Sequence, residues 1–288
     1  MRYKHILTVF FCSIPAVVFA RALQLVKLTD HTTGLITRNK PAMMITAFIG
    51  LVTLVVLGCA ITIKRAPLKT PRVKKPLGIA AALAAVGIAA DAISVLRLST
   101  VVNWQRFAVL IAGAATTIFY LLYAAKAVKK YPLEKLFYII PTVYWGLRLV
   151  VTFINIAPMT LISENAYLIL AQAATTLFMF EFGKIANGYD KEKSYKKILV
   201  TGVASVLLNA AFSVPQMFLL LTDYKATEHQ SSGILFGSML TGVFVTMYLL
   251  AHFANRNLKN HHYRRKKELA EDKFLKINSP TQNFYCGE

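Results

Sequence analysis

Residues 42–63, AMMITAFIGLVTLVVLGCAITI, form a run that contains no charged side chain. A helix rises about 1.5 Å per residue, so roughly 20 apolar residues cross the hydrocarbon core of a bilayer. Lys64 and Arg65 follow the run directly and mark the point where it reaches water. The run therefore predicts a transmembrane helix.

Seven further runs of similar length and composition divide the chain. They cover residues 6–26, 77–96, 107–125, 136–156, 166–185, 198–221 and 234–253. Backbone groups in lipid must be satisfied within the segment, and these runs do not alternate apolar and polar residues as barrel strands do. We therefore predict an all-α, polytopic integral membrane helical bundle of eight transmembrane helices. Its transmembrane domain covers residues 1–255, and a basic cytoplasmic tail covers residues 256–288.

Composition and charge distribution exclude two other classes of protein. The 288 residues are 56% hydrophobic and only 16% charged, whereas a soluble domain carries about 25% charged residues. The net charge of +20 suits nucleic acid in principle, but it is confined to short segments between apolar runs. Anionic lipid and the rules of membrane insertion account for charge in that position. We expect membrane lipids as partners and no nucleic acid.

The basic residues alternate along the chain between rich and poor connections. The N-terminus, the even-numbered connections and the tail hold 24 Lys and Arg residues, and the odd-numbered connections hold 6. Short loops rich in Lys and Arg stay in the cytoplasm. The pattern predicts that both termini are cytoplasmic, in a plasma (inner) membrane of the bacterial type.

The first run has two interpretations. It has a charged start, an apolar stretch and a tolerable cleavage site at residues 18–20, as a signal peptide has. Cleavage there would leave seven helices and the same orientation for the rest. Against cleavage, residues 3–7 (YKHIL) recur as residues 195–199 (YKKIL), at the start of another predicted span. We favour a retained first helix and keep the signal peptide as the alternative.

An internal similarity suggests related helical hairpins. Residues 112–119 (AGAATTIF) resemble residues 171–178 (AQAATTLF) in a later span. Repeats of this kind are common in transporter folds, although apolar helices of biased composition also match by chance. Four related hairpins are therefore a hypothesis about the bundle.

Charged residues inside predicted spans are the main candidates for function, because they are costly in lipid. With the predicted orientation, Arg21 and Asp91 lie about 8 Å below the outer interface and Arg148 about 12 Å below it. The three depths differ by less than one helical turn. The remaining candidate substrate-binding residues lie in the same outer half: Asn155, Gln172 and Gln216.

These residues permit two arrangements. In one, Asp91 pairs with Arg148 or Arg21 in an outward-facing polar pocket, and the other arginine remains for an anionic or zwitterionic ligand, because a guanidinium matches carboxylate and phosphate geometry. In the other, a closed Asp–Arg pair only fixes helix packing, and Arg21 extends to the lipid head groups. A stripe of small residues at 87–92 suits close packing of the helix that carries Asp91.

Motifs for enzymatic chemistry are missing from the sequence. It contains no metalloprotease, nucleophile-elbow, P-loop or Cys-x-x-Cys motif, and no pair of carboxylates within the spans. We expect no enzyme, no cofactor, no catalytic residue and no metal site. An intramembrane enzyme acting on lipids would need a further polar cluster.

The favoured function is a secondary transporter or permease-like component for a small, anionic or zwitterionic solute. The alternative is a non-transporting membrane sensor or accessory subunit that acts on a cytoplasmic protein partner through its tail. The tail holds a basic cluster at residues 264–267, which suits anionic lipid or simply enforces orientation.

Overall fold

The computed structural model describes residues 3–29, 39–62, 75–97, 104–129, 133–156, 163–189, 191–222 and 232–252, nearly all of which are helical. The helices are α1 (Tyr3–Leu28), α2 (Asn39–Ile61), α3 (Lys75–Arg97), α4 (Trp104–Lys129), α5 (Ile140–Ile156), α6 (Ser163–Asn187), α7 (Lys191–Leu221) and a final helix (Ser232–His252). A short 3₁₀ helix, η1 (Lys135–Ile139), precedes α5. Eight helical segments are long and apolar enough to cross a membrane. The predicted all-α bundle is confirmed.

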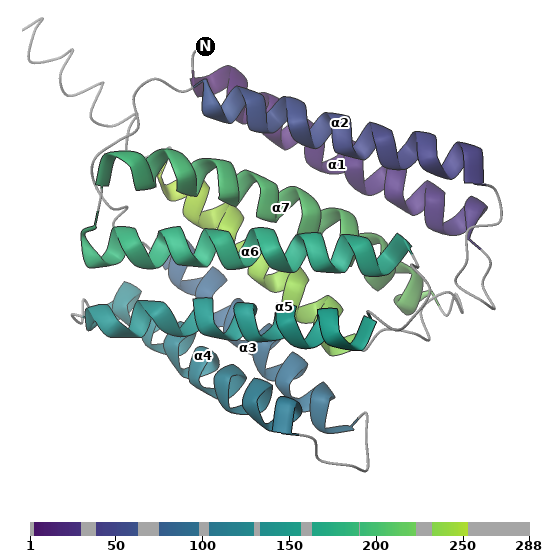
Figure 1. The fold of residues 1–288 in the computed structure, drawn as a ribbon. Coiled ribbons are helices and arrows are strands. Elements are labelled where there is room, and N and C mark those ends of the chain that lie inside the picture. Colours follow the sequence, from purple (N-terminus) through teal and green to yellow (C-terminus); the bar gives the residue numbers. More distant parts are fainter. Residues whose placement is uncertain are drawn as a thin grey trace, which may run out of the picture.

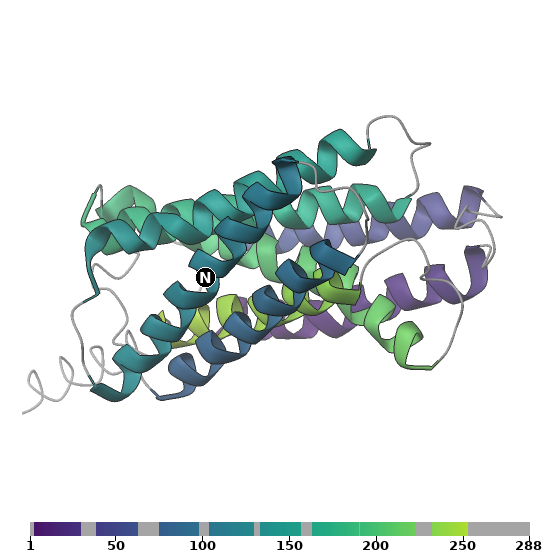
Figure 2. The ribbon, with the colours of Figure 1, turned by 90° about the horizontal axis from the view of Figure 1, so that it is seen from below.

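The seven numbered helices pack against one another in a series, and the final helix packs against several of them (Figure 1). Contacts run from α2 to α1, then to α7, α6, α5, α4 and α3. The final helix, unlabelled and yellow-green in Figure 1, passes behind α6 and α7, and the view from below shows it between α3 and α7 (Figure 2). Its Phe244 contacts Tyr120 of α4, and its Tyr248 contacts Phe178 of α6. The final helix is therefore a central element of the bundle.

Burial differs sharply between the outer and the central helices. In the most apolar 18-residue stretch of each helix, only 17% of α2 is buried, whereas 67% of α7 and 61% of the final helix are buried. Large apolar side chains of α2, such as Met43, Met44 and Leu54, are exposed. Exposed apolar side chains on a membrane helix are suited to hydrocarbon, so α2 presents a lipid-facing surface.

Glycines allow the final helix to lie against α3. A Cβ on Gly87 would lie 3.2 Å from the Cα of Gly237, and a Cβ on Gly233 would lie 2.4 Å from Ser94 Oγ. Small residues at such crossings let membrane helices approach closely. The packing role predicted for the small-residue stripe at 87–92 is confirmed.

Prolines occupy two kinds of position in the helices, the interior and the first turn. Pro15 and Pro215 lie inside α1 and α7. Pro141 is the second residue of α5, directly after η1, so the span predicted over 136–156 consists of two helical pieces. The first turn of a helix tolerates proline because its N–H groups have no partner within the helix.

The two similar stretches of α4 and α6 make the same local hydrogen bonds. Thr116 and Thr117 donate to the carbonyls of Ala112 and Gly113. Thr175 and Thr176 donate to the carbonyls of Ala171 and Gln172. Threonines elsewhere in the bundle, such as Thr53 and Thr246, make the same bond, so it does not distinguish a repeat, and the four related hairpins stay a prediction.

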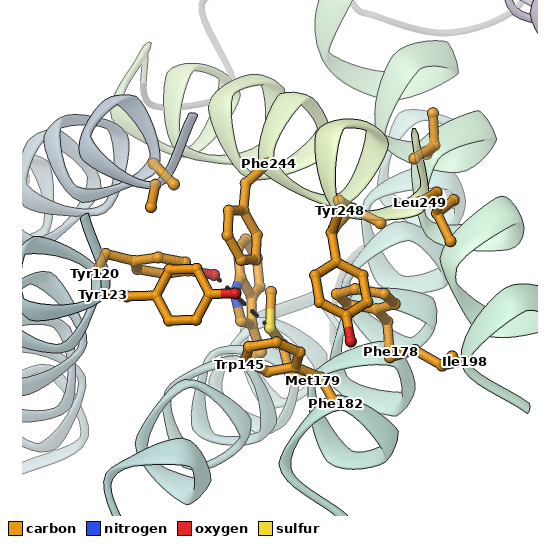
Figure 3. Packing of buried hydrophobic residues seen from close by; sticks show 14 of the residues in the cluster. Tyr120, Tyr123, Trp145, Phe178, Met179, Phe182, Ile198, Phe244, Tyr248 and Leu249 are labelled. Atoms are coloured by element: carbon orange, nitrogen blue, oxygen red, sulfur yellow. Dashed lines mark hydrogen bonds between the residues drawn. The ribbon is translucent and has the colours of Figure 1, made fainter. Parts of the chain in front are cut away.

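A cluster of aromatic side chains fills the core between α4, α6 and the final helix (Figure 3). Phe182 contacts Tyr123 and Tyr248 edge-on, with ring centroids 5.9 and 5.1 Å apart. Phe244 contacts Tyr120 in the same way at 5.1 Å. Edge-to-face contacts are favourable beyond the burial of area, so this cluster fixes the positions of the central helices.

Candidate functional site

Asp91 of α3 and Arg148 of α5 form an ion pair inside the bundle. Arg148 Nη2 lies 2.8 Å from Asp91 Oδ1, and Arg148 Nε donates to Asp91 Oδ2 at 3.1 Å. The hydroxyl of Tyr144 also donates to Oδ2. We call Asp91, Tyr144 and Arg148 the ion-pair cluster. Both carboxylate oxygens are thus engaged, and the side chains of Asp91 and Arg148 are only 3% and 12% exposed.

Helical spacing and small neighbours explain how the ion-pair cluster forms. Tyr144 and Arg148 are four residues apart on α5 and so lie on one face of that helix. A Cβ on Gly113 of α4 would lie 3.3 Å from the ring of Tyr144, and a Cβ on Gly237 of the final helix would lie 3.3 Å from Asp91 Cβ. The neighbouring helices present glycine at these points and leave room for the tyrosine and the carboxylate.

Arg21 of α1 lies in a second group of polar residues. It is fully buried, donates to Gln24 Oε1 at 2.8 Å, and its guanidinium carbon lies 4.3 Å from the centre of the Tyr167 ring. Gln24 in turn donates to Thr46 Oγ1 of α2 at 3.3 Å. We call Arg21, Gln24 and Tyr167 the arginine cluster. The alternative in which Arg21 extends to the lipid head groups is wrong, because stacking on Tyr167 holds the side chain inside.

Gln172 of α6 and Gln216 of α7 are buried with their amide groups unsatisfied. Neither the amide nitrogen nor the amide oxygen of either residue has a hydrogen-bond partner among the described residues. The same holds for the hydroxyl of Tyr167. Buried polar groups in natural proteins are normally hydrogen-bonded, and an exception indicates water, an ion or a ligand. Other buried polar atoms also have no partner among the described residues, including both ring nitrogens of His252, but in each of these two glutamines the whole amide group is unsatisfied.

The position of Gln216 follows from the packing of α7 on α1. Leu219 of α7 and Leu25 of α1 form one buried pair, and Phe212 and Val17 belong to one buried cluster. Gln216 lies between Phe212 and Leu219 along α7, and Arg21 lies between Val17 and Leu25 along α1. Helix packing thus brings Gln216 to the level of the arginine cluster.

The predicted site residues therefore fall into more than one place. Asp91 and Arg148 meet, Arg21 has its own cluster, and Gln172 and Gln216 are buried on α6 and α7. Asn155 lies near the end of α5, and its side chain is outside the described residues. Their joint role in binding a solute stays a prediction.

Sequence reasoning missed three residues of these clusters. Tyr144 precedes Arg148 by four residues and Gln24 follows Arg21 by three, so helical spacing offered a signal for both. Tyr167 lies on another helix, and no local pattern connects it with Arg21.

Other polar contacts lie near the middle and the end of the bundle. Asn209 of α7 donates to Thr175 Oγ1 of α6 at 2.8 Å, a bond between two helices. Glu181 and Lys184 form an ion pair on α6, at 3.5 Å. His252, at the end of the final helix, is buried and stacks on Tyr195.

The residues described contain no group of three His, Cys, Asp or Glu side chains arranged to hold a metal ion. The chain matches no family model, no curated protein and no solved structure. Inferences about function therefore rest on the geometry of the two clusters and the buried amides.

Proposed function

We propose that the protein is a secondary transporter or permease-like component for a small anionic or zwitterionic solute. In this proposal Arg148 binds the anionic group of the solute in place of Asp91. The buried amides of Gln172 and Gln216 contact polar parts of the solute along its path, and Arg21 adds a second buried positive charge.

The unsatisfied amides of Gln172 and Gln216 are the observation that carries this proposal. An amide buried without a partner costs about 1–3 kcal/mol in a folded protein, and lipid offers no hydrogen bonds in compensation. Helix packing alone gives no reason to keep two such side chains. A passage that holds water or a polar solute gives one, because either supplies the missing partners.

The geometry around Arg148 supports an anionic group on the solute. Asp91 accepts from both Nε and Nη2 of the guanidinium, which is the two-point arrangement in which arginine binds carboxylate and phosphate. A solute carboxylate can take the same two donors when Asp91 moves away. The protein's own carboxylate thus occupies the place that we propose for the solute.

A solute-uptake experiment with stability as a second readout tests the proposal. The purified protein is placed in liposomes, and uptake of radiolabelled lactate, glutamate and inorganic phosphate is measured one by one. Gln172→Leu and Gln216→Leu are compared with Gln105→Leu, a half-buried glutamine at the start of α4. We expect the first two to keep or raise thermal stability and to reduce uptake at least tenfold, and the third to leave uptake unchanged.

The result separates transport from the alternative function. If both glutamine variants lose stability, the amides serve packing, and the observation behind the proposal fails. If no anion is taken up and deletion of residues 256–288 abolishes the cellular phenotype, a sensor or accessory subunit acting through the tail is supported instead. That tail lies outside the described residues.

A further inference from the structure

We propose that Asp91 binds one proton for each monoanion that Arg148 binds, so that the ion-pair cluster couples solute movement to protons in a ratio of one to one. This inference rests on the proposed transport function and adds the coupling ion. It follows from charge balance in the ion-pair cluster and from the hydroxyl groups that lead to it.

The charges of the ion-pair cluster balance only in certain combinations. Asp91 and Arg148 together have no net charge. When a monoanion takes the guanidinium, an ionised Asp91 leaves the buried site with one uncompensated negative charge, which a low-dielectric interior strongly disfavours. If Asp91 is then protonated, Arg148 and the anion balance each other, and the site is neutral again. One proton per monoanion is the combination that avoids a buried net charge.

The surroundings of Asp91 contain no other described charge that would replace the proton. On α5 it faces Tyr144 and Arg148, and these are its hydrogen-bond partners. The final helix faces it with Gly237, which has no titratable side chain, and α4 presents Gly113 to Tyr144 beside it. Among the described residues, the groups that interact electrostatically with Arg148 are Asp91 and Tyr144. The charge balance therefore depends on the carboxylate, the guanidinium and the solute.

The proton step needs only local changes at the Asp91 carboxylate. Arg148 Nε and Nη2 leave Oδ2 and Oδ1 and turn to the solute, and a proton adds to the vacated Oδ1. The hydroxyl of Tyr144 keeps donating to Oδ2, which becomes the carbonyl oxygen of the neutral acid. One O–H bond forms, no electron is transferred, and the reverse step returns the proton when the solute leaves.

A row of hydroxyl groups on α4 leads away from the ion-pair cluster. Tyr144 contacts α4 at Gly113, and the buried residues Thr116, Tyr120 and Tyr123 follow on one face of that helix. Figure 3 shows Tyr120 and Tyr123 pointing from α4 into the core toward Met179. The hydroxyl of Tyr120 donates to Met179 Sδ at 3.7 Å, and sulfur is a weak acceptor.

The row ends at Lys126 near the end of α4. Lys126 Nζ donates to the hydroxyl of Tyr138 at 3.1 Å, and the Tyr138 ring lies 6.3 Å from that of Tyr123. Among the described residues the hydrogen bonds of this row go to other groups and not from one hydroxyl to the next, so passage of a proton along it needs water between the hydroxyls. With the orientation predicted from the basic loops, this row extends from Asp91 toward the cytoplasm.

Infrared spectroscopy on the protein in lipid nanodiscs tests the proton site without any solute. A protonated Asp91 gives a carboxylic acid band that an ionised Asp91 does not. The neutral variants Arg148→Gln and Arg148→Met are compared with wild type and with Arg148→Lys at pH 7. We expect a carboxylic acid band with the intensity of one carboxyl group in both neutral variants. The band should disappear when Asp91→Asn is added, and it should be absent from wild type and from Arg148→Lys.

Two neutral variants are used so that one that fails to fold leaves the comparison possible, and wild-type protein supplies a second measurement. In liposomes that contain a pH-sensitive dye, an inward gradient of lactate should acidify the interior by one proton per lactate taken up. The inference is overturned if folded Arg148→Gln or Arg148→Met lacks an Asp91-dependent band, or if anion uptake proceeds without proton movement.

These results also separate this inference from the proposed function. Uptake of an anion without acidification would leave transport in place and reject the coupling ion. An Asp91-dependent acid band together with no uptake of any tested anion would support the proton site and count against transport of these anions.

Discussion

Arg148 holds both carboxylate oxygens of Asp91 through two different nitrogens, across the interface of α3 and α5. The two residues differ in how they respond to the loss of a partner. An aspartate left alone can bind a proton, whereas an arginine cannot lose one at any pH that the fold survives. This difference makes the two halves of the pair separable by mutation.

Asp91→Asn and Arg148→Gln should therefore differ in the pH dependence of their stability. Removing one partner of a buried pair costs about 3–5 kcal/mol, and for Asp91→Asn this cost should not change between pH 7 and pH 5. If Asp91 takes up a proton in Arg148→Gln, as proposed above, lower pH should favour the folded state of that variant. The cost of Arg148→Gln should therefore be smaller at pH 5 than at pH 7.

Reversible unfolding in mixed micelles, followed at several pH values, measures both variants. The double variant Asp91→Asn with Arg148→Leu is the control, because it removes both charges and should recover part of the lost stability. Parallel pH profiles for the two single variants would contradict protonation of an unpaired Asp91.

The fold was largely predictable because the signal for a membrane span is local. Length and apolar composition identified all eight helices, and the small-residue stripe at 87–92 identified one packing surface. The sequence did not show which helices are buried at the centre of the bundle and which are exposed at its edge. The most apolar span, Lys40–Ile61, is the least buried, and the least apolar, Asn165–Asn187, is among the most buried. Lipid tolerates apolar surface as well as a neighbouring helix does, so hydropathy does not rank burial.

The candidate site was only partly predictable. Depth along the spans placed Arg21, Asp91 and Arg148 in one layer. It did not decide whether Asp91 pairs with Arg21 or with Arg148. The choice of Arg148 depends on α3 and α5 presenting these side chains to each other, with glycine on the adjoining helices. Tyr167 stacks on Arg21 from a distant part of the sequence, and such contacts depend on tertiary packing that local periodicity does not encode.

A matched pair of glycine substitutions should test the contact of the final helix with α3. A Cβ on Gly233 would lie 2.4 Å from Ser94 Oγ and 2.7 Å from the carbonyl oxygen of Ala90. Because a backbone oxygen cannot easily move, Gly233→Ala should destabilise the protein by about 1–3 kcal/mol. Gly50→Ala on α2, where nothing lies within 4 Å, should be neutral or stabilising by about 0.5–1 kcal/mol. Thermal unfolding in one detergent compares the two variants, and equal losses would argue against a tight contact at Gly233.

Asn209 should contribute modestly to the contact between α6 and α7. Its amide nitrogen donates to Thr175 Oγ1 at 2.8 Å and to Ser205 Oγ at 3.2 Å. Hydrogen bonds between membrane helices average about 0.6 kcal/mol, so Asn209→Ala should cost about 0.5–1.5 kcal/mol. Thr201→Ala is the control, because the Thr201 hydroxyl is exposed and donates to Lys197 within its own helix. Unfolding free energies that are equal for the two variants would show that the bond between the helices adds nothing.

Reporter fusions should place both ends of the chain on the cytoplasmic side. Eight crossings return the chain to the side on which it starts, and the Lys- and Arg-rich connections predict that this side is the cytoplasm. A fluorescent protein that matures only in the cytoplasm should be bright on either terminus. The same reporter after residue 30 or residue 160, in odd-numbered connections, should be dark, while an enzyme active only outside the cytoplasm should work there. Cleavage after residue 20 would separate an N-terminal tag from the protein, and the intact mass measured in parallel detects that event. Signals from opposite compartments at the two ends of an uncleaved chain would reject the predicted depths of Asp91 and Arg148.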